Sequence, residues 1–226
     1  VVVLASMDWV RWYFETPLSP VTTTVFAVLF VLYAAIRVRV AWPKVRALKM
    51  ALRGEVAVGQ FLEEQLGVFS GRVFHDIPIK SGDRVIANID HVAICSKGIL
   101  VVETKTWSKS QNDKIVFDGK AIFVNGTLEP DRNPVDQAKS NARWIRDLLE
   151  ELTGHRFLTR PVVLFPGWYV EGSSREKSAR KPDDVWVLSA KALPAFLEHE
   201  ADQFDEQQVK MISGQLSRDL RRGRRL

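Results

Sequence analysis

The stretch from Asn88 to Lys105 places the strongest constraint on the fold, because it predicts two buried strands joined by a tight turn. Residues 92–95 and 99–102 are apolar and largely β-branched, and the turn residues Lys97 and Gly98 lie between them. Nearly continuous apolar strands are typical of a sheet that is covered on both faces. The sequence therefore predicts a hairpin inside an α/β domain.

Three charged side chains interrupt this apolar hairpin: Asp90, Glu103 and Lys105. A turn centred on Lys97 and Gly98 would place Asp90 opposite Lys105. Side chains two positions apart on a strand share a face, so all three are expected to project from the same side. Two carboxylates and one ammonium group should then lie within a few ångströms of one another.

Such a cluster has two interpretations. A salt bridge between neighbouring strands is common on a solvated sheet face, and it needs no function. Charges in strands that are buried on both faces, however, cost free energy unless a metal or a partner compensates them. Two carboxylates suit Mg²⁺ or Mn²⁺, and a nearby lysine can orient or deprotonate a water molecule.

The order of an Asp followed by Glu-x-Lys on the next strand resembles the PD-(D/E)-X-K nuclease superfamily. With its flanking motifs, the chain resembles the nuclease-related domain (NERD) family of that superfamily over residues 54–165. A tryptophan expected in the strand before Asn125 is replaced within residues 120–123. The motifs that carry the resemblance are Gly54-Glu55, Val73 to Ile77, Ala87 to Val92, Gly98-Ile99, Val102 to Lys105, Asn125-Gly126 and Asn133 to Gln137.

The resemblance implies an α/β fold of the restriction-endonuclease type, with a mixed central sheet flanked by helices. It also implies that Asp90, Glu103 and Glu55 bind Mg²⁺ or Mn²⁺, and that Lys105 and Gln137 complete the catalytic set. The expected reaction is hydrolysis of phosphodiester bonds in nucleic acid, with DNA favoured over RNA.

Two of these residues are expected on helices. Glu55 falls in the first turn of an amphipathic helix predicted from Gly54 to Leu66, where a carboxylate can also simply stabilise the helix dipole. Gln137 lies on the border of the apolar face of a second helix, which Asn133 caps and which runs to about residue 152. A solvated or capping role is the alternative for Gln137.

Other polar and aromatic residues near the hairpin are weaker candidates. By parity His91 faces away from Asp90, which predicts a hydrogen-bonded structural role. Trp107 and Lys109 follow the Glu-x-Lys strand and are candidates for base stacking and phosphate contact, with local packing as the alternative for Trp107.

An apolar segment of nineteen uncharged residues, Leu18 to Ile36, precedes the domain. At 1.5 Å per residue it is long enough to cross a bilayer. A signal-peptide core or a buried helix is the alternative, but residues 1–17 lack a basic n-region. We therefore predict an N-terminal segment (1–17), a transmembrane helix (18–40) and a basic juxtamembrane linker (41–53).

The distribution of charge predicts the orientation of this helix. Residues 37–53 carry six basic and no acidic side chains, so the positive-inside rule places the C-terminal domain in the cytoplasm, on a single-pass cell-membrane protein. This block contributes +6 and the tail from Arg218 to Arg225 contributes +4 to a net charge of +5. The remainder is therefore acidic, and overall basicity does not indicate a nucleic-acid surface. Both basic blocks can instead contact anionic lipids.

After the core (54–165), residues 166–226 are expected to form a C-terminal extension with one strand, two closing helices and the arginine-rich tail. Two further functions remain open beside the nuclease. One is an inactive nuclease-fold module that binds nucleic acid or a protein partner at the membrane. The other is a membrane scaffold in which the charged cluster is only a salt-bridge network. The sequence does not indicate an oligomeric state.

Overall fold

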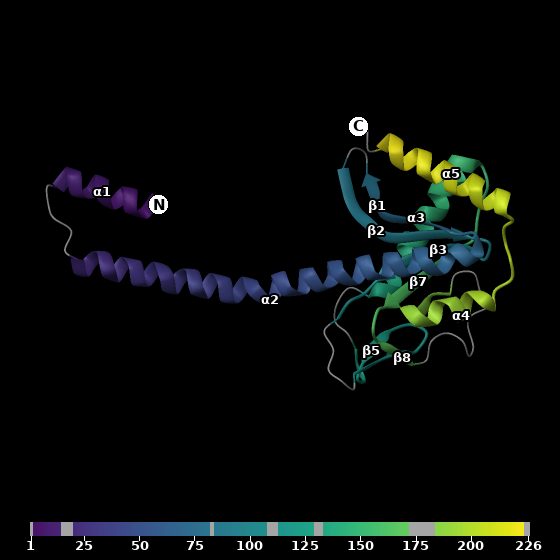
Figure 1. The fold of residues 1–226 in the computed structure, drawn as a ribbon, viewed down its shortest axis with the longest axis horizontal. Helices are drawn as coiled ribbons and strands as arrows, with labels where there is room; N and C mark the ends of the chain where they lie inside the picture. Colours follow the sequence, from purple (N-terminus) through teal and green to yellow (C-terminus); the bar gives the residue numbers. More distant parts are fainter. Residues whose placement is uncertain are drawn as a thin grey trace. The chain divides into compact units, whose positions relative to one another are not determined.

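A computed structural model of the chain describes residues 2–14, 20–81, 84–107, 113–128, 133–171 and 184–223. The chain divides into two compact units, Val1–Lys49 and Met50–Leu226. The helix α1 (Val2–Phe14) belongs to the first unit, and the long helix α2 (Pro20–Leu66) contributes residues to both (Figure 1).

The helix α2 contains one stretch that is long and apolar enough to cross a membrane. Its most apolar window of 18 residues has a mean hydropathy of 1.9, and none of that window is buried. This stretch is a candidate membrane anchor. The expected start of a separate helix at Gly54 is wrong, because α2 begins at Pro20 and continues through the basic stretch. Good helix formers flank Gly54, and one glycine costs a helix only about 1 kcal/mol.

The core of the second unit is a five-stranded mixed sheet with the strand order β1-β2-β3-β7-β9. Its first three strands are antiparallel neighbours, whereas β7 and β9 continue the sheet parallel to β3. This arrangement confirms the predicted mixed sheet. The strands are β1 (Arg72–Ser81), β2 (Arg84–Cys95), β3 (Gly98–Thr104), β7 (Thr159–Phe165) and β9 (Trp186–Ser189).

The register of the central hairpin differs from the predicted one. Cys95 pairs with Gly98 and His91 pairs with Val102, so the turn consists of Ser96 and Lys97. Gly98, with a φ of 128°, is already a strand residue. The same register places Asp90 opposite Glu103, and the predicted pairing of Asp90 with Lys105 is wrong by two positions. A shift of two keeps every side chain on its predicted face.

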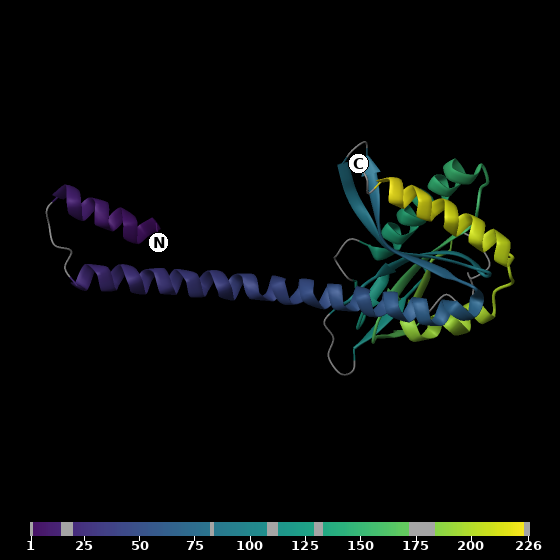
Figure 2. The same ribbon diagram turned by 45° about the horizontal axis from the view of Figure 1, so that its top comes forward.

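Helices cover both faces of the sheet (Figure 2). One face packs against the end of α2 and against α4 (Leu193–Glu198), and its core includes Leu62, Ala93 and Leu193. The other face packs against α3 (Pro134–Thr153) and α5 (Glu206–Gly223) through residues such as Ile145 and Ile212. Two short 3₁₀ helices, η1 (Gly67–Phe69) and η2 (Ala190–Ala192), follow α2 and precede α4.

A smaller second sheet has the order β6-β5-β4-β8; three of its strands lie between β3 and β7 in the sequence, and β8 follows β7. The predicted hairpin of β4 and β5 is confirmed, and Asn125 and Gly126 both have positive φ angles in the turn that follows it. The pairing with β8 was not predicted. The strands are β4 (Lys114–Phe117), β5 (Ile122–Val124), β6 (Thr127–Leu128) and β8 (Tyr169–Glu171).

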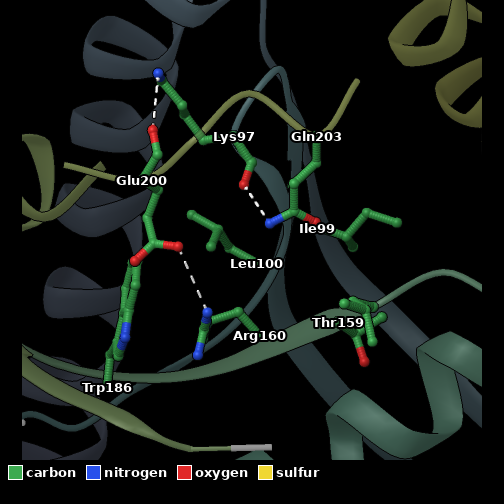
Figure 3. A pocket seen from close by; sticks show the side chains of 10 residues that line it. Lys97, Ile99, Leu100, Thr159, Arg160, Trp186, Glu200 and Gln203 are labelled. Carbon is green, nitrogen blue, oxygen red and sulfur yellow. Dashed lines mark hydrogen bonds and ion pairs between the residues drawn. The ribbon is translucent and has the colours of Figure 1, made fainter. Parts of the chain in front are cut away.

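The segment between α4 and α5 is fastened to the β2–β3 turn (Figure 3). The backbone N–H of Gln203 donates to the carbonyl of Ser96 at 2.7 Å, and Lys97 Nζ donates to the carbonyl of Glu200 at 3.0 Å. A cavity of about 180 Å³ lies beside this segment, lined in part by Arg160 and Trp186. Residues at the start of β3 line this cavity, so it lies at the opposite end of that strand from Glu103.

We expect buried side chains of the α3 face to contribute far more to stability than exposed ones. Leu149 is fully buried in that core, whereas Leu158 is 57% exposed. Leu149→Ala should lower the free energy of unfolding by about 2–4 kcal/mol, and Leu158→Ala by less than about 0.5 kcal/mol. Urea unfolding of the full-length protein in mild detergent, followed by tryptophan fluorescence, measures both. Equal losses in the two variants would contradict the described packing.

Candidate functional site

The C-terminal end of β3 carries a buried carboxylate paired with a lysine. Glu103 is only 3% exposed, and its Oε1 lies 2.8 Å from Lys105 Nζ. The backbone N–H of Lys105 donates to the carbonyl of Leu164 on β7 at 2.9 Å. The lysine is therefore fixed at the end of two neighbouring parallel strands, with its side chain on the Glu103 face.

Asp90 reaches the same place from β2. Its Oδ2 accepts a hydrogen bond from the backbone N–H of Thr104 at 2.7 Å, at the end of β3. The corrected register explains this contact, because Asp90 lies opposite Glu103. The structure thus brings Asp90, Glu103 and Lys105 together on one face, as the sequence predicted.

The helix α3 supplies two amide side chains to this cluster. Gln137 Oε1 accepts a hydrogen bond from Lys105 Nζ at 3.2 Å, and Asn141 Nδ2 donates to Glu103 Oε2 at 3.2 Å. The two residues are one helical turn apart, so both reach the sheet from the same side of α3. The N-cap at Asn133, whose Oδ1 accepts from the backbone N–H of Val135, fixes where this helix begins. Sequence reasoning missed Asn141, although its spacing of four from Gln137 is a usable signal.

Glu55 approaches the cluster from α2, and a glycine makes that approach possible. A Cβ atom on Gly54 would lie 2.1 Å from Thr106 Oγ1, so only glycine fits there without displacement. A fourth acid, Asp76 on β1, also lies near Glu55 and Asp90, since its charge affects the pKa of both. Asp76 was not predicted; it has a positive φ of 52° and accepts from Asn88 Nδ2 at 2.6 Å.

Burial and mutual repulsion raise the pKa values of all three predicted metal ligands. Burial, followed by the charge of Asp90, raises the pKa of Glu103 to about 7, against the opposing effect of Lys105. Burial also raises the pKa of Asp90, although the Thr104 N–H and Lys105 oppose the shift. For Glu55, burial and then the charge of Asp90 raise the pKa. Each of these carboxyl groups therefore holds its proton more tightly than an exposed one does.

This donor set fits a divalent cation in chemistry and charge. Carboxylate oxygens are the ligands that Mg²⁺ and Mn²⁺ prefer, and a cation would offset the repulsion between Asp90, Glu103 and Glu55. Within the described residues, however, no three His, Cys, Asp or Glu side chains are already arranged around a common point. Lys105 and Asn141 each contact one oxygen of Glu103, which leaves a further lone pair on both oxygens for a metal ion.

The weaker candidates are placed as follows. His91 is buried and hydrogen-bonded to His75, in agreement with the structural role predicted for it. The ring of Trp107 packs against Phe165 with 4.9 Å between centroids, which is local packing. Lys109 lies outside the described residues.

Comparisons with known proteins point to one family. The family described as NERD, nuclease-related domain, matches residues 51–166, just over half of the chain. Among solved structures, "The structure of Pyrococcus Furiosus SfsA in complex with Ca2+" is similar at 15% identity with a TM-score of 0.31, covering 57% of this chain and 52% of that one. This chain therefore spans about half the length of that protein. The comparison with curated proteins gave no match.

The raised pKa of Glu103 predicts how stability depends on pH without divalent metal. The folded state holds the Glu103 proton more tightly than the unfolded chain, whose glutamate has the ordinary value of 4.5. This contribution is fully present below about pH 4.5 and is lost as the pH rises through about 7, at up to about 1 kcal/mol per pH unit.

In chelator, the Glu103 contribution to the free energy of unfolding should therefore fall between pH 5 and pH 8. The buried His91 acts in the opposite direction up to about pH 6.5, because burial lowers its pKa to about 4. Glu103→Gln should remove the falling contribution, whereas the exposed control Glu151→Gln should retain it. Chemical unfolding at a series of pH values measures both. An unchanged slope in Glu103→Gln would mean that other groups set the pH dependence.

Proposed function

This chain belongs to the nuclease-related domain family, and on that premise we propose that it is a metal-dependent nuclease that hydrolyses phosphodiester bonds of nucleic acid. The observation that carries the proposal is the position of Lys105. Its Nζ lies between Glu103 Oε1 and Gln137 Oε1, and Asp90 on the neighbouring strand β2 accepts from the backbone N–H of Thr104 beside them. An acid pair and a restrained lysine at one strand end are the parts that this reaction needs.

In this proposal Asp90 and Glu103 hold Mg²⁺ or Mn²⁺, and Glu55 completes the site from α2. When bound, the ion polarises the scissile phosphate and lowers the pKa of a coordinated water. Lys105 positions the attacking water and stabilises negative charge that develops on the phosphate. Gln137 restrains the Lys105 ammonium group, and Asn141 orients the Glu103 carboxylate.

The substrate class follows from the family, whose description names nucleases. We propose DNA ahead of RNA as the substrate. Outside its two basic blocks the chain is acidic, so it does not offer a broad basic surface for phosphate groups. In this proposal, phosphate recognition depends instead on the bound cation.

A second candidate function is an inactive nuclease-fold module that binds nucleic acid or a protein partner. The contacts of Glu103 favour it, because Lys105 and Asn141 already engage both carboxylate oxygens. Such a module retains the salt bridge and hydrogen bonds of the cluster without using them in chemistry. The nuclease requires a divalent metal for cleavage, whereas the inactive module cleaves nothing with or without metal.

The candidate anchor suggests where the protein acts. We propose that the apolar first part of α2, up to about residue 40, crosses the cell membrane once and that the C-terminal domain lies in the cytoplasm. The six basic residues at positions 37–53 support this orientation, since basic flanks are retained on the cytoplasmic side.

Cleavage of nucleic acid tests the proposed activity. Full-length protein in detergent should cut single- or double-stranded DNA with Mg²⁺ or Mn²⁺ and not in chelator, with RNA tested in parallel. Glu103→Gln and Lys105→Met should each lower the rate at least about 100-fold, because both act on charge that develops in the reaction. The exposed substitutions Glu151→Gln and Lys191→Met are matched controls. Folded protein that binds nucleic acid but cuts none of these substrates would favour the inactive module.

Protease accessibility tests the proposed topology. In inside-out membrane vesicles, added protease should remove an epitope placed after residue 226. In right-side-out vesicles the same epitope should be protected. The opposite pattern would reverse the orientation, and release of the protein by carbonate washing would exclude a spanning helix.

A further inference from the structure

Two histidines on neighbouring strands join the sheet to the helix that carries Glu55. His75 on β1 pairs with His91 on β2 in the strand ladder, and their Nδ1 atoms lie 2.8 Å apart. The rings are nearly perpendicular, with 5.0 Å between centroids. One ring nitrogen must donate and the other accept, so this contact is a hydrogen bond between side chains.

The helix α2 lies on these two rings. His75 Nε2 is 2.9 Å from Glu63 Oε1 on that helix. A Cβ atom on Gly59 would lie 3.2 Å from Cε1 of His75 and 3.3 Å from Cε1 of His91. The absence of a side chain at Gly59 therefore lets the helix backbone rest against both imidazoles.

His91 also faces the turn of α2 that contains Glu55. The side chain is only 2% exposed, and its Nε2 has no hydrogen bond of standard geometry within the described part of the chain. The backbone of Glu55 is nevertheless close enough to raise the pKa of His91. Burial has the larger effect and lowers this pKa to about 4. The pair thus contacts α2 at Glu55, Gly59 and Glu63, which are spaced by one helical turn.

Glu55 needs such support more than the other two acids of the cluster. Asp90 and Glu103 lie on adjacent strands, whose hydrogen-bonded ladder fixes their separation. The place of Glu55 depends instead on how α2 is seated on the sheet. His91 directly follows Asp90 in β2 and projects from the opposite face, so it can tie the Glu55 helix to the strand that carries Asp90.

We propose that His75 and His91 are positioning residues for the metal site, which hold the Glu55 carboxylate beside Asp90 by seating α2 on the β1–β2 hairpin. This proposal rests on the proposed function in one respect, namely that Glu55 takes part in binding the metal. Residues that orient metal ligands commonly change metal affinity 10- to 100-fold when they are replaced.

Mn²⁺ binding to the full-length protein in detergent, measured by electron paramagnetic resonance, gives a readout that does not depend on cleavage. Glu55→Gln should weaken Mn²⁺ binding about 10-fold or more, and His91→Phe should weaken it to a similar extent. The double variant should bind no more weakly than Glu55→Gln alone, because both changes remove the same contribution. His199→Gln, an exposed histidine with its own backbone contact, is the matched control and should not change the affinity.

A second measurement reports the seating of α2 without any metal. In His91→Phe, hydrogen exchange should accelerate at residues 54–60, while the buried strand β3 keeps its protection. Additive effects of His91→Phe and Glu55→Gln on Mn²⁺ affinity, or unchanged exchange at residues 54–60, would overturn the positioning role. Wild-type protein that binds no Mn²⁺, or an Asp90→Asn variant with unchanged affinity, would instead overturn the metal site of the proposed function, and with it any positioning role for that site.

Discussion

The burial of the Glu103 carboxylate is the constraint on which this structure depends. A carboxylate in the middle of a covered sheet costs several kcal/mol unless charges and hydrogen bonds compensate it. Lys105 contacts one oxygen and Asn141 the other, and these contacts tie the end of β3 to helix α3. Gln137 then holds the lysine from the next turn of the same helix. The same contacts therefore compensate the buried charge and hold α3 against the sheet.

The parts of this arrangement that follow from periodicity were predictable. Alternation along β3 places Glu103 and Lys105 on one face, and Asp90 shares that face because the predicted and observed registers differ by two positions. The cap at Asn133 with its apolar stripe predicts α3. The register itself was not predictable from turn residues, because Gly98 suits a turn and yet lies in the strand. Asn141 and Asp76 were missed for a different reason, since their roles depend on tertiary contacts that a local pattern does not specify.

The two ends of β3 are held in different ways. At its start, the Gln203 segment fastens the β2–β3 turn with backbone and amide hydrogen bonds, and Lys97 forms an ion pair with Asp202 at 3.1 Å. At its finish, charged side chains make most of the contacts, and burial together with neighbouring acids raises the pKa values of Glu103, Asp90 and Glu55. Charges of opposite sign are paired at the first end, whereas acids outnumber the single lysine at the second. This difference in charge between the two ends of β3 marks the Glu103 end as the candidate site.

The short turn between β2 and β3 also has a consequence for the order of folding. A hairpin closed by two residues involves only local contacts, and such hairpins form within microseconds, well before distant segments meet. We therefore expect Asp90 and Glu103 to become neighbours while water still surrounds both. On this view they lose that water when α3 docks, and α3 brings Gln137 and Asn141 with it. The chain removes water from its charges at the step that also supplies their partners.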